Sequence, residues 1–250
     1  MKSSGLRPRL AALVTACIVC LCLLALSSAP AWAKVGSIKG FPVPTPSSGP
    51  DGITAGPDGN LWFTESSTLA NKIGRITPKG TITEFSVPTP GGSPFGITAG
   101  PDGNLWFTES GTNEIGRITT AGAVTGEFLI PTPMSDPFGI TAGPDGNLWF
   151  TEANASKIGR ISTSGAITEF SIPTANSAPQ GITAGPDGNL WFAEFGGNKI
   201  GRISTSGSFT EFPVPTPSSD PVNITAGPPA RIGTVWFTEN SGNKIGKITT

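Results

Sequence analysis

A fourteen-residue phrase recurs along the chain and constrains its fold more than any other feature. Gly-Ile-Thr-Ala-Gly-Pro-Asp-Gly-Asn-Leu-Trp-Phe-Thr-Glu opens at Gly52 and returns with few changes at Gly96, Gly139 and Gly181, with an altered fifth copy from Asn223. Successive copies start 44, 43, 42 and 42 residues apart. A fixed period in this range is typical of repeated supersecondary units. The chain is therefore expected to fold as an array of five similar units.

The third copy shows how one unit should fold. Apolar and β-branched residues favour strands over 140–142, 148–152, 157–162 and 166–172, which we call strands A to D. Asp-Gly supplies the positive φ of a tight hairpin between A and B. After residue 33, Gly and Pro interrupt the sequence too often for a helix. Four antiparallel strands in about 43 residues describe one blade of an all-β propeller.

The two ends of the repeat array suggest how the propeller closes. The last copy reaches Thr250 after strand C, and residues 37–46 resemble 208–217, which form a strand D in the fourth copy. The sequence therefore predicts a five-bladed monomeric ring in which the N-terminal strand completes the last blade. Such pairing would satisfy two open sheet edges. In the alternative, the five blades do not close alone and the chain associates with another copy.

Residues 1–33 have the pattern of a secretory signal peptide. Basic residues precede an apolar run over 10–26, and Ala31-Trp32-Ala33 forms a small-residue cleavage site. An uncleaved membrane anchor and a lipoprotein cleavage site at Cys17 are the alternatives. Cleavage after Ala33 would leave 34–250 as a single propeller domain, secreted or held in the cell envelope, with no membrane segment.

The composition of residues 34–250 limits the possible partners. All three cysteines lie in the leader, so the remaining chain can form no disulfide. Without the three basic residues of the leader, 13 basic and 17 acidic residues remain. This acidic balance does not favour nucleic acid or anionic lipid as a partner.

One face of the propeller is expected to vary from blade to blade. The residue just before strand A follows a proline in every copy and is Asp51, Phe95, Phe138, Gln180 or Val222. The loops after strand B also differ, and one of them contains Phe195. Binding sites concentrate where a rigid scaffold displays differing loops. These six residues are the predicted ligand-binding set, near the central channel, for an unknown small molecule, peptide or glycan.

A glutamate ends strand B in every copy. The five are Glu65, Glu109, Glu152, Glu194 and Glu239. If they point toward the channel, they would repel one another and bind a cation or have raised pKa values. If they point between blades, they would accept hydrogen bonds.

Two further repeated features have structural interpretations. The tryptophans of strand B are expected to fill the space between sheets. The arginines of strand C are expected to form exposed cross-strand ion pairs with glutamates of strand D. These residues are Trp62, Trp106, Trp149, Trp191 and Trp236, then Arg75, Arg117, Arg160 and Arg202, and then Glu84, Glu127, Glu169 and Glu211.

The blade phrases resemble those of streptogramin B lyases, also called virginiamycin B lyases. The similarity rests on Gly-Ile-Thr-Ala-Gly, Leu-Trp-Phe-Thr-Glu, Asn-Lys-Ile-Gly-Arg-Ile and Ile-Thr-Glu-Phe, and it covers essentially all of 34–250. The resemblance implies a propeller, normally of seven blades. It also implies opening of a cyclic depsipeptide antibiotic by elimination at its ester bond, with magnesium polarising the substrate and histidine as base.

The chain departs from that family where the chemistry should be. It contains no histidine, and Asp51 is the one acid at the positions where the family has its histidines. Asp136 and Asp220 match one magnesium position of the family. The family's second magnesium position lies one residue beyond the five glutamates, and here it holds serine, alanine, phenylalanine or asparagine. The five glutamates themselves are further magnesium candidates.

Three hypotheses follow from these departures. A secreted binding propeller that lacks the family's catalysis is favoured, with Asp51 as the one candidate catalytic residue. The alternative is a magnesium-dependent lyase that inactivates an antibiotic with a base other than histidine. A structural module of the cell envelope is the third.

Overall fold

The computed structural model describes residues 36–228 and 233–250, so the expected leader at 1–33 lies outside the described residues. Contacts divide the chain into two units, Met1–Pro42 and Val43–Thr250. In the first unit, residues 36–42 are described and contain no strand. The described strands all belong to the second unit. Over the described ranges, no helix is long and apolar enough to cross a membrane.

The second unit contains five antiparallel sheets whose strands follow chain order. Their strands are β1 (Pro50–Ala55), β2 (Leu61–Glu65), β3 (Lys72–Ile76) and β4 (Ile82–Ser86); β5 (Pro94–Ala99), β6 (Leu105–Glu109), β7 (Glu114–Ile118) and β8 (Val124–Leu129); β9 (Pro137–Ala142), β10 (Leu148–Glu152), β11 (Lys157–Ile161) and β12 (Ile167–Ser171); β13 (Pro179–Ala184), β14 (Leu190–Glu194), β15 (Lys199–Ile203) and β16 (Phe209–Pro213); and β17 (Pro221–Ala226), β18 (Thr234–Glu239) and β19 (Lys244–Thr249). The predicted all-β class is confirmed, and four of the five sheets have the predicted four strands.

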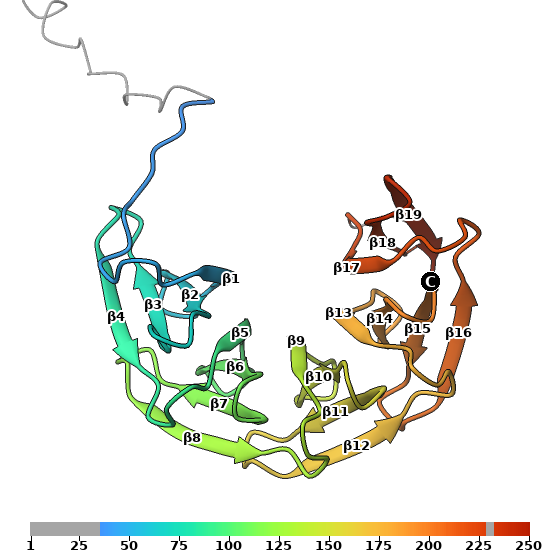
Figure 1. Cartoon of the computed structure of the whole chain (residues 1–250), viewed down its shortest axis with the longest axis horizontal. Coiled ribbons are helices and arrows are strands. Elements are labelled where there is room, and N and C mark those ends of the chain that lie inside the picture. The colour runs from blue at the N-terminus through green and yellow to red at the C-terminus, as the bar shows by residue number, and fades with distance from the viewer. Residues whose placement is uncertain (1–35, 229–232) are drawn as a thin grey trace, which may run out of the picture. The chain divides into compact units, whose positions relative to one another are not determined.

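The sheets of the second unit follow one another around an arc. The first strand of each sheet lies on the inner side, and the fourth strand lies on the outer side (Figure 1). Inner strands of neighbouring sheets contact one another, β1 with β5 and so on to β17. The variable residues before strand A therefore come together at the centre of the arc.

The predicted fourth strand of the last sheet is not formed. This sheet contains β17, β18 and β19, and residues 36–46 have no strand structure. Instead, the backbone N–H and the hydroxyl of Thr45 donate to Glu84 of the first sheet, at 2.8 and 2.9 Å. Thr89, Thr132 and Thr174 make the same backbone contact with the sheet that follows their own loop, so this segment is docked as an ordinary crossover.

The core lies between neighbouring sheets. Trp62 and Ile73 of the first sheet pack on Leu105 and Phe107 of the second, and the later sheets repeat this arrangement. Four of the five tryptophans of strand B are buried as predicted, whereas Trp236 on β18 is 37% exposed. A buried aromatic of this size contributes about 1.5–3 kcal/mol, so these interfaces fix the arc.

The predicted pairing of arginine with glutamate is wrong. Arg75 lies opposite Thr83 in the register of β3 and β4, whereas Glu84 lies opposite Gly74. Since neighbouring residues of a strand point to opposite faces, Arg75 and Glu84 cannot meet. The guanidinium instead lies 5.6 Å from the ring centroid of Trp62 and donates to Thr120 of the next sheet. Lysine takes the predicted role: Lys72, Lys157 and Lys199 pair with Glu84, Glu169 and Glu211.

Candidate functional site

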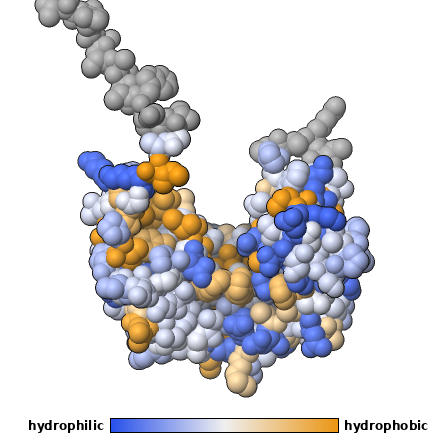
Figure 2. All heavy atoms as spheres, turned by 45° about the horizontal axis from the view of Figure 1, so that its top comes forward, coloured by the Kyte–Doolittle hydropathy of each residue, from blue (hydrophilic) through white to orange (hydrophobic). Residues whose placement is uncertain are grey.

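Four of the five variable residues, each the second residue of its inner strand, surround a hollow of about 500 Å³ at the centre of the arc. We call it the central hollow. Asp51, Phe95, Phe138 and Val222 line it, together with Asn223 and with glycines and isoleucines of the inner strands. Figure 2 shows apolar side chains gathered along this concave side. Of the predicted ligand-binding set, Gln180 and Phe195 are not part of the lining.

A repeated threonine positions the lining residues. The hydroxyl of Thr108 on β6 accepts the N–H of Gly96 and donates to the carbonyl of Phe138 in the next sheet, both at 2.9 Å. Thr64 and Thr151 donate in the same way to the carbonyls of the next sheets, each at 2.7 Å. These bonds join inner strands that are not paired as a ladder. The sequence reasoning missed this role, although the threonine belongs to the repeated phrase.

Glycine after each lining residue permits this close approach. A Cβ atom on Gly96 would lie 2.5 Å from the carbonyl oxygen of Phe138, well inside normal contact distance. At Val222 the hydroxyl is missing because Ala193 replaces the threonine, although a Cβ atom on Gly181 would still lie 2.7 Å from the carbonyl oxygen of Val222. The central hollow is therefore built most regularly around Phe95 and Phe138.

Two aromatic rings and one carboxylate dominate the chemistry of the central hollow. The ring centroids of Phe95 and Phe138 lie 4.2 Å apart at an interplanar angle of 42°. Asp51 is exposed at the edge of the lining, and burial raises the pKa of its carboxyl above the ordinary value. The rings offer an apolar surface, and Asp51 accepts hydrogen bonds. Such a surface suits a ligand with apolar groups and a few donors.

The five glutamates that end strand B do not form a ring around the channel. Glu109 lies over its own sheet, since a Cβ atom on Gly116 of β7 would approach its Oε1 to 2.7 Å. Burial, and then the charges of Glu127 and Glu114, raise the pKa of Glu109 to about 8. Burial is also the largest cause that raises the pKa of Glu152 and of Glu194 to about 8. Raised pKa values were expected only for side chains that point toward the channel, whereas here their largest cause is burial within each sheet.

The positions that the resemblance assigns to magnesium do not form an acidic cluster in the described residues. Among the described residues, one group of three acidic side chains brings its ligand oxygens within 4.8 Å of one another. That group includes neither Asp136 nor Asp220. The side chain of Asp220 accepts from the hydroxyl of Ser241, and burial raises the pKa of Asp136. The described residues bring no group of acidic ligands together at Asp136 or Asp220, so we derive no reaction step through magnesium.

Comparison with known proteins supports the same architecture. The model of the virginiamycin B lyase family matches residues 29–250. Virginiamycin B lyase from Staphylococcus aureus, solved with selenomethionine, is 51% identical with a TM-score of 0.82, over 87% of this chain and 72% of that one. A catalytically inactive histidine-to-alanine variant of that enzyme, solved with quinupristin, is 50% identical with the same TM-score and coverage. A streptogramin B lyase is 43% identical with a TM-score of 0.79, over 87% of this chain and 71% of that one.

Proposed function

The chain belongs to the virginiamycin B lyase family, and we propose that it binds a cyclic peptide or depsipeptide in the central hollow without opening its ring. The observation that carries this proposal is the composition of the hollow. It combines Phe95, Phe138 and Val222 with the carboxylate of Asp51, and the whole chain has no histidine. The scaffold for binding is thus present without the side chain best suited to remove a proton at neutral pH.

The size of the central hollow supports a ligand of this kind. Its volume of about 500 Å³ lies within the range of roughly 300–1,000 Å³ that is usual for small-molecule sites. Apolar rings on adjacent sheets can contact apolar groups of a cyclic peptide, and Asp51 can accept a hydrogen bond from a ligand amide. The S. aureus variant offers a parallel, since that catalytically inactive lyase was solved together with quinupristin.

Isothermal titration of the purified protein with quinupristin tests this proposal. We expect saturable binding with one ligand per chain. The proposal would be contradicted if quinupristin gives no measurable heat and if no other cyclic depsipeptide binds in its place.

A lyase is the second candidate, because Asp51 lies in the central hollow and burial raises the pKa of its carboxyl. A raised pKa makes a carboxylate a better base. An opened product that disappears in Asp51→Asn would favour this candidate over binding alone.

The proposal includes the site of action. Because residues 1–33 have the pattern of a secretory signal, we place the binding outside the cytoplasm. N-terminal sequencing of the protein from the culture medium or the cell envelope tests this, with a start at Lys34 as the expected result.

A further inference from the structure

One strand position distinguishes the second sheet from the other four. Glu114 begins β7 and lies opposite Glu109 in the register. The equivalent residue of each other sheet is a lysine opposite its strand-B glutamate. These pairs are Glu65 with Lys72, Glu152 with Lys157, Glu194 with Lys199, and Glu239 with Lys244.

The lysine places a positive charge between acceptor groups. In the third sheet, Nζ of Lys157 lies 3.3 Å from Oε2 of Glu169 and 2.6 Å from the hydroxyl of Thr132. The first and fourth sheets repeat both contacts with Lys72 and Lys199. Three sheets therefore hold an ammonium group at the same place, beside a buried glutamate.

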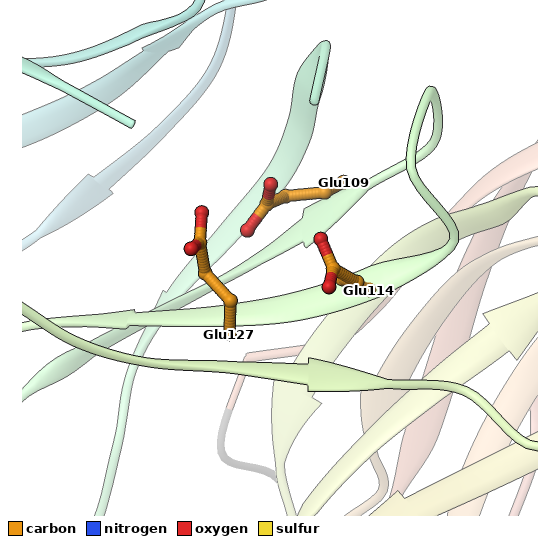
Figure 3. A group of neighbouring side chains, drawn as sticks. All are labelled: Glu109, Glu114 and Glu127. Atoms are coloured by element: carbon orange, nitrogen blue, oxygen red, sulfur yellow. The ribbon is translucent and has the colours of Figure 1, made fainter. Parts of the chain in front are cut away.

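In the second sheet the same place holds three carboxylates and no ammonium group. Oxygens of Glu109, Glu114 and Glu127 all lie within 4.8 Å of one another. Figure 3 shows the three side chains, from β6, β7 and β8, pointing toward one another. This arrangement concentrates negative charge where the neighbouring sheets have a cation.

Two oxygens of this cluster have no hydrogen-bond partner in the protein. Glu109 is fully buried, and its Oε1 has no hydrogen-bond partner. Oε2 of Glu114 is also buried without a partner. A buried carboxylate without a compensating charge or donor costs several kcal/mol. A cation between the three groups would remove this cost.

We propose that Glu109, Glu114 and Glu127 bind one calcium ion, which takes the place of the lysine ammonium group of the other sheets. A separation of up to 4.8 Å between oxygens is about twice the calcium–oxygen distance of roughly 2.3–2.6 Å. Three carboxylates suit calcium better than magnesium, which keeps several waters and uses one or two carboxylates.

Thr89 gives the site a fourth oxygen. Its backbone N–H donates to Oε1 of Glu127 at 3.0 Å, as Thr132 donates to Glu169. Thr89 therefore occupies the position of Thr132, whose hydroxyl contacts the lysine. Its hydroxyl is available to the ion in the same way, and water would complete the coordination.

Calcium titration of the chelator-treated full chain, followed by isothermal calorimetry, tests the site. We expect one ion per chain, with a dissociation constant on the order of 10⁻⁴–10⁻³ M, as in extracellular calcium modules. Magnesium should bind more weakly. Absence of calcium binding up to about ten times that concentration range would show that protons alone neutralise the cluster, and would overturn the proposal.

Two reciprocal variants distinguish a specific calcium site from nonspecific attraction of cations to an acidic protein. Glu114→Lys installs the side chain of the other sheets, so we expect the folded protein to lose binding by roughly 100-fold. Lys157→Glu recreates the three carboxylates in the third sheet and should raise the stoichiometry to two ions per chain. If Glu114→Lys binds calcium unchanged, or Lys157→Glu folds without a second ion, the assignment is wrong.

Discussion

The ring centroids of Phe95 and Phe138 lie 4.2 Å apart although the two residues belong to different sheets. Each stands just before the glycine that opens its copy of the repeated phrase. Their contact shows that neighbouring blades build one surface in the central hollow. Proposed ligand binding therefore depends on the junction between sheets rather than on any single blade.

Replacing both rings should remove ligand binding and leave the fold intact. Each ring is half-buried, and a hot-spot aromatic contributes about 2 kcal/mol or more to binding, roughly 30-fold in affinity. For Phe95→Ala with Phe138→Ala, we expect at least this loss for quinupristin in calorimetry. The loss of unfolding free energy in denaturant should stay below the roughly 3–5 kcal/mol of a core Phe→Ala change.

Leu129→Ala is the matched control for the aromatic pair. Leu129 is 69% exposed on the outer strand β8 and does not line the central hollow. The affinity of the Leu129→Ala protein for quinupristin should equal that of the unchanged protein. Equal losses in both variants would place the ligand elsewhere.

The threonine bridge between sheets should matter for both stability and binding. Thr108→Val keeps the shape but leaves the N–H of Gly96 and the carbonyl of Phe138 without their partner. An unsatisfied buried group costs about 1–3 kcal/mol. We expect a loss of that size in chemical unfolding, together with weaker ligand binding. Thr83→Val, on the exposed face of β4, should change neither quantity measurably.

The buried glutamates should make stability depend on pH. Burial, reinforced by Glu169, raises the pKa of Glu152 to about 8 from an ordinary value of 4.5. Between these pH values the folded state holds a proton that the unfolded chain releases. The contribution of this group to the unfolding free energy is therefore full below about pH 4.5 and lost as pH rises through about 8.

Glu152→Gln should flatten this part of the pH profile. Its melting temperature should match that of the unchanged protein near pH 5 and exceed it near pH 9, by about 2–4 °C for each kcal/mol recovered. Glu84→Gln is a control in which the pH dependence of stability should change in the opposite direction. Burial alone would raise the pKa of Glu84, but hydrogen bonds from Lys72 and Thr45 outweigh it and lower the pKa. Identical profiles for the two variants would refute this explanation.

The repeat predicted local structure well because each strand and turn depends on nearby residues. The hairpin of the third copy is an example. Asp145 accepts from Asn147 and from Nε1 of Trp149, within five positions of the chain. The strand positions and the buried tryptophans follow from this local pattern.

The incorrect predictions concern which way a side chain points and which segment lies nearby. Arg75 and Glu84 were expected to pair from their strands alone, but a one-residue difference in register puts them on opposite faces. The segment 37–46 has the sequence of a fourth strand, yet Thr45 is bonded to Glu84 of the first sheet. A similar sequence shows what a segment can form, and not which sheet edge it reaches.

The central hollow was predicted in part. Residues before strand A lie on one face of any four-stranded meander, so Asp51, Phe95, Phe138 and Val222 could be placed together from topology. The glutamates could not, because Gly116 leaves room for Glu109 to lie across its own sheet. That room depends on contacts between side chains, which the repeat does not reveal.

The state of quinupristin after incubation with the protein tests the central claim most directly. Ring opening by elimination leaves the mass unchanged, so the products must be separated by chromatography and identified by fragmentation in the mass spectrometer. With magnesium and calcium present, at a protein concentration that gives measurable binding, we predict that the antibiotic elutes as the intact cyclic molecule. A linear product that forms with the unchanged protein and is lost in Asp51→Asn would contradict the account and establish a lyase.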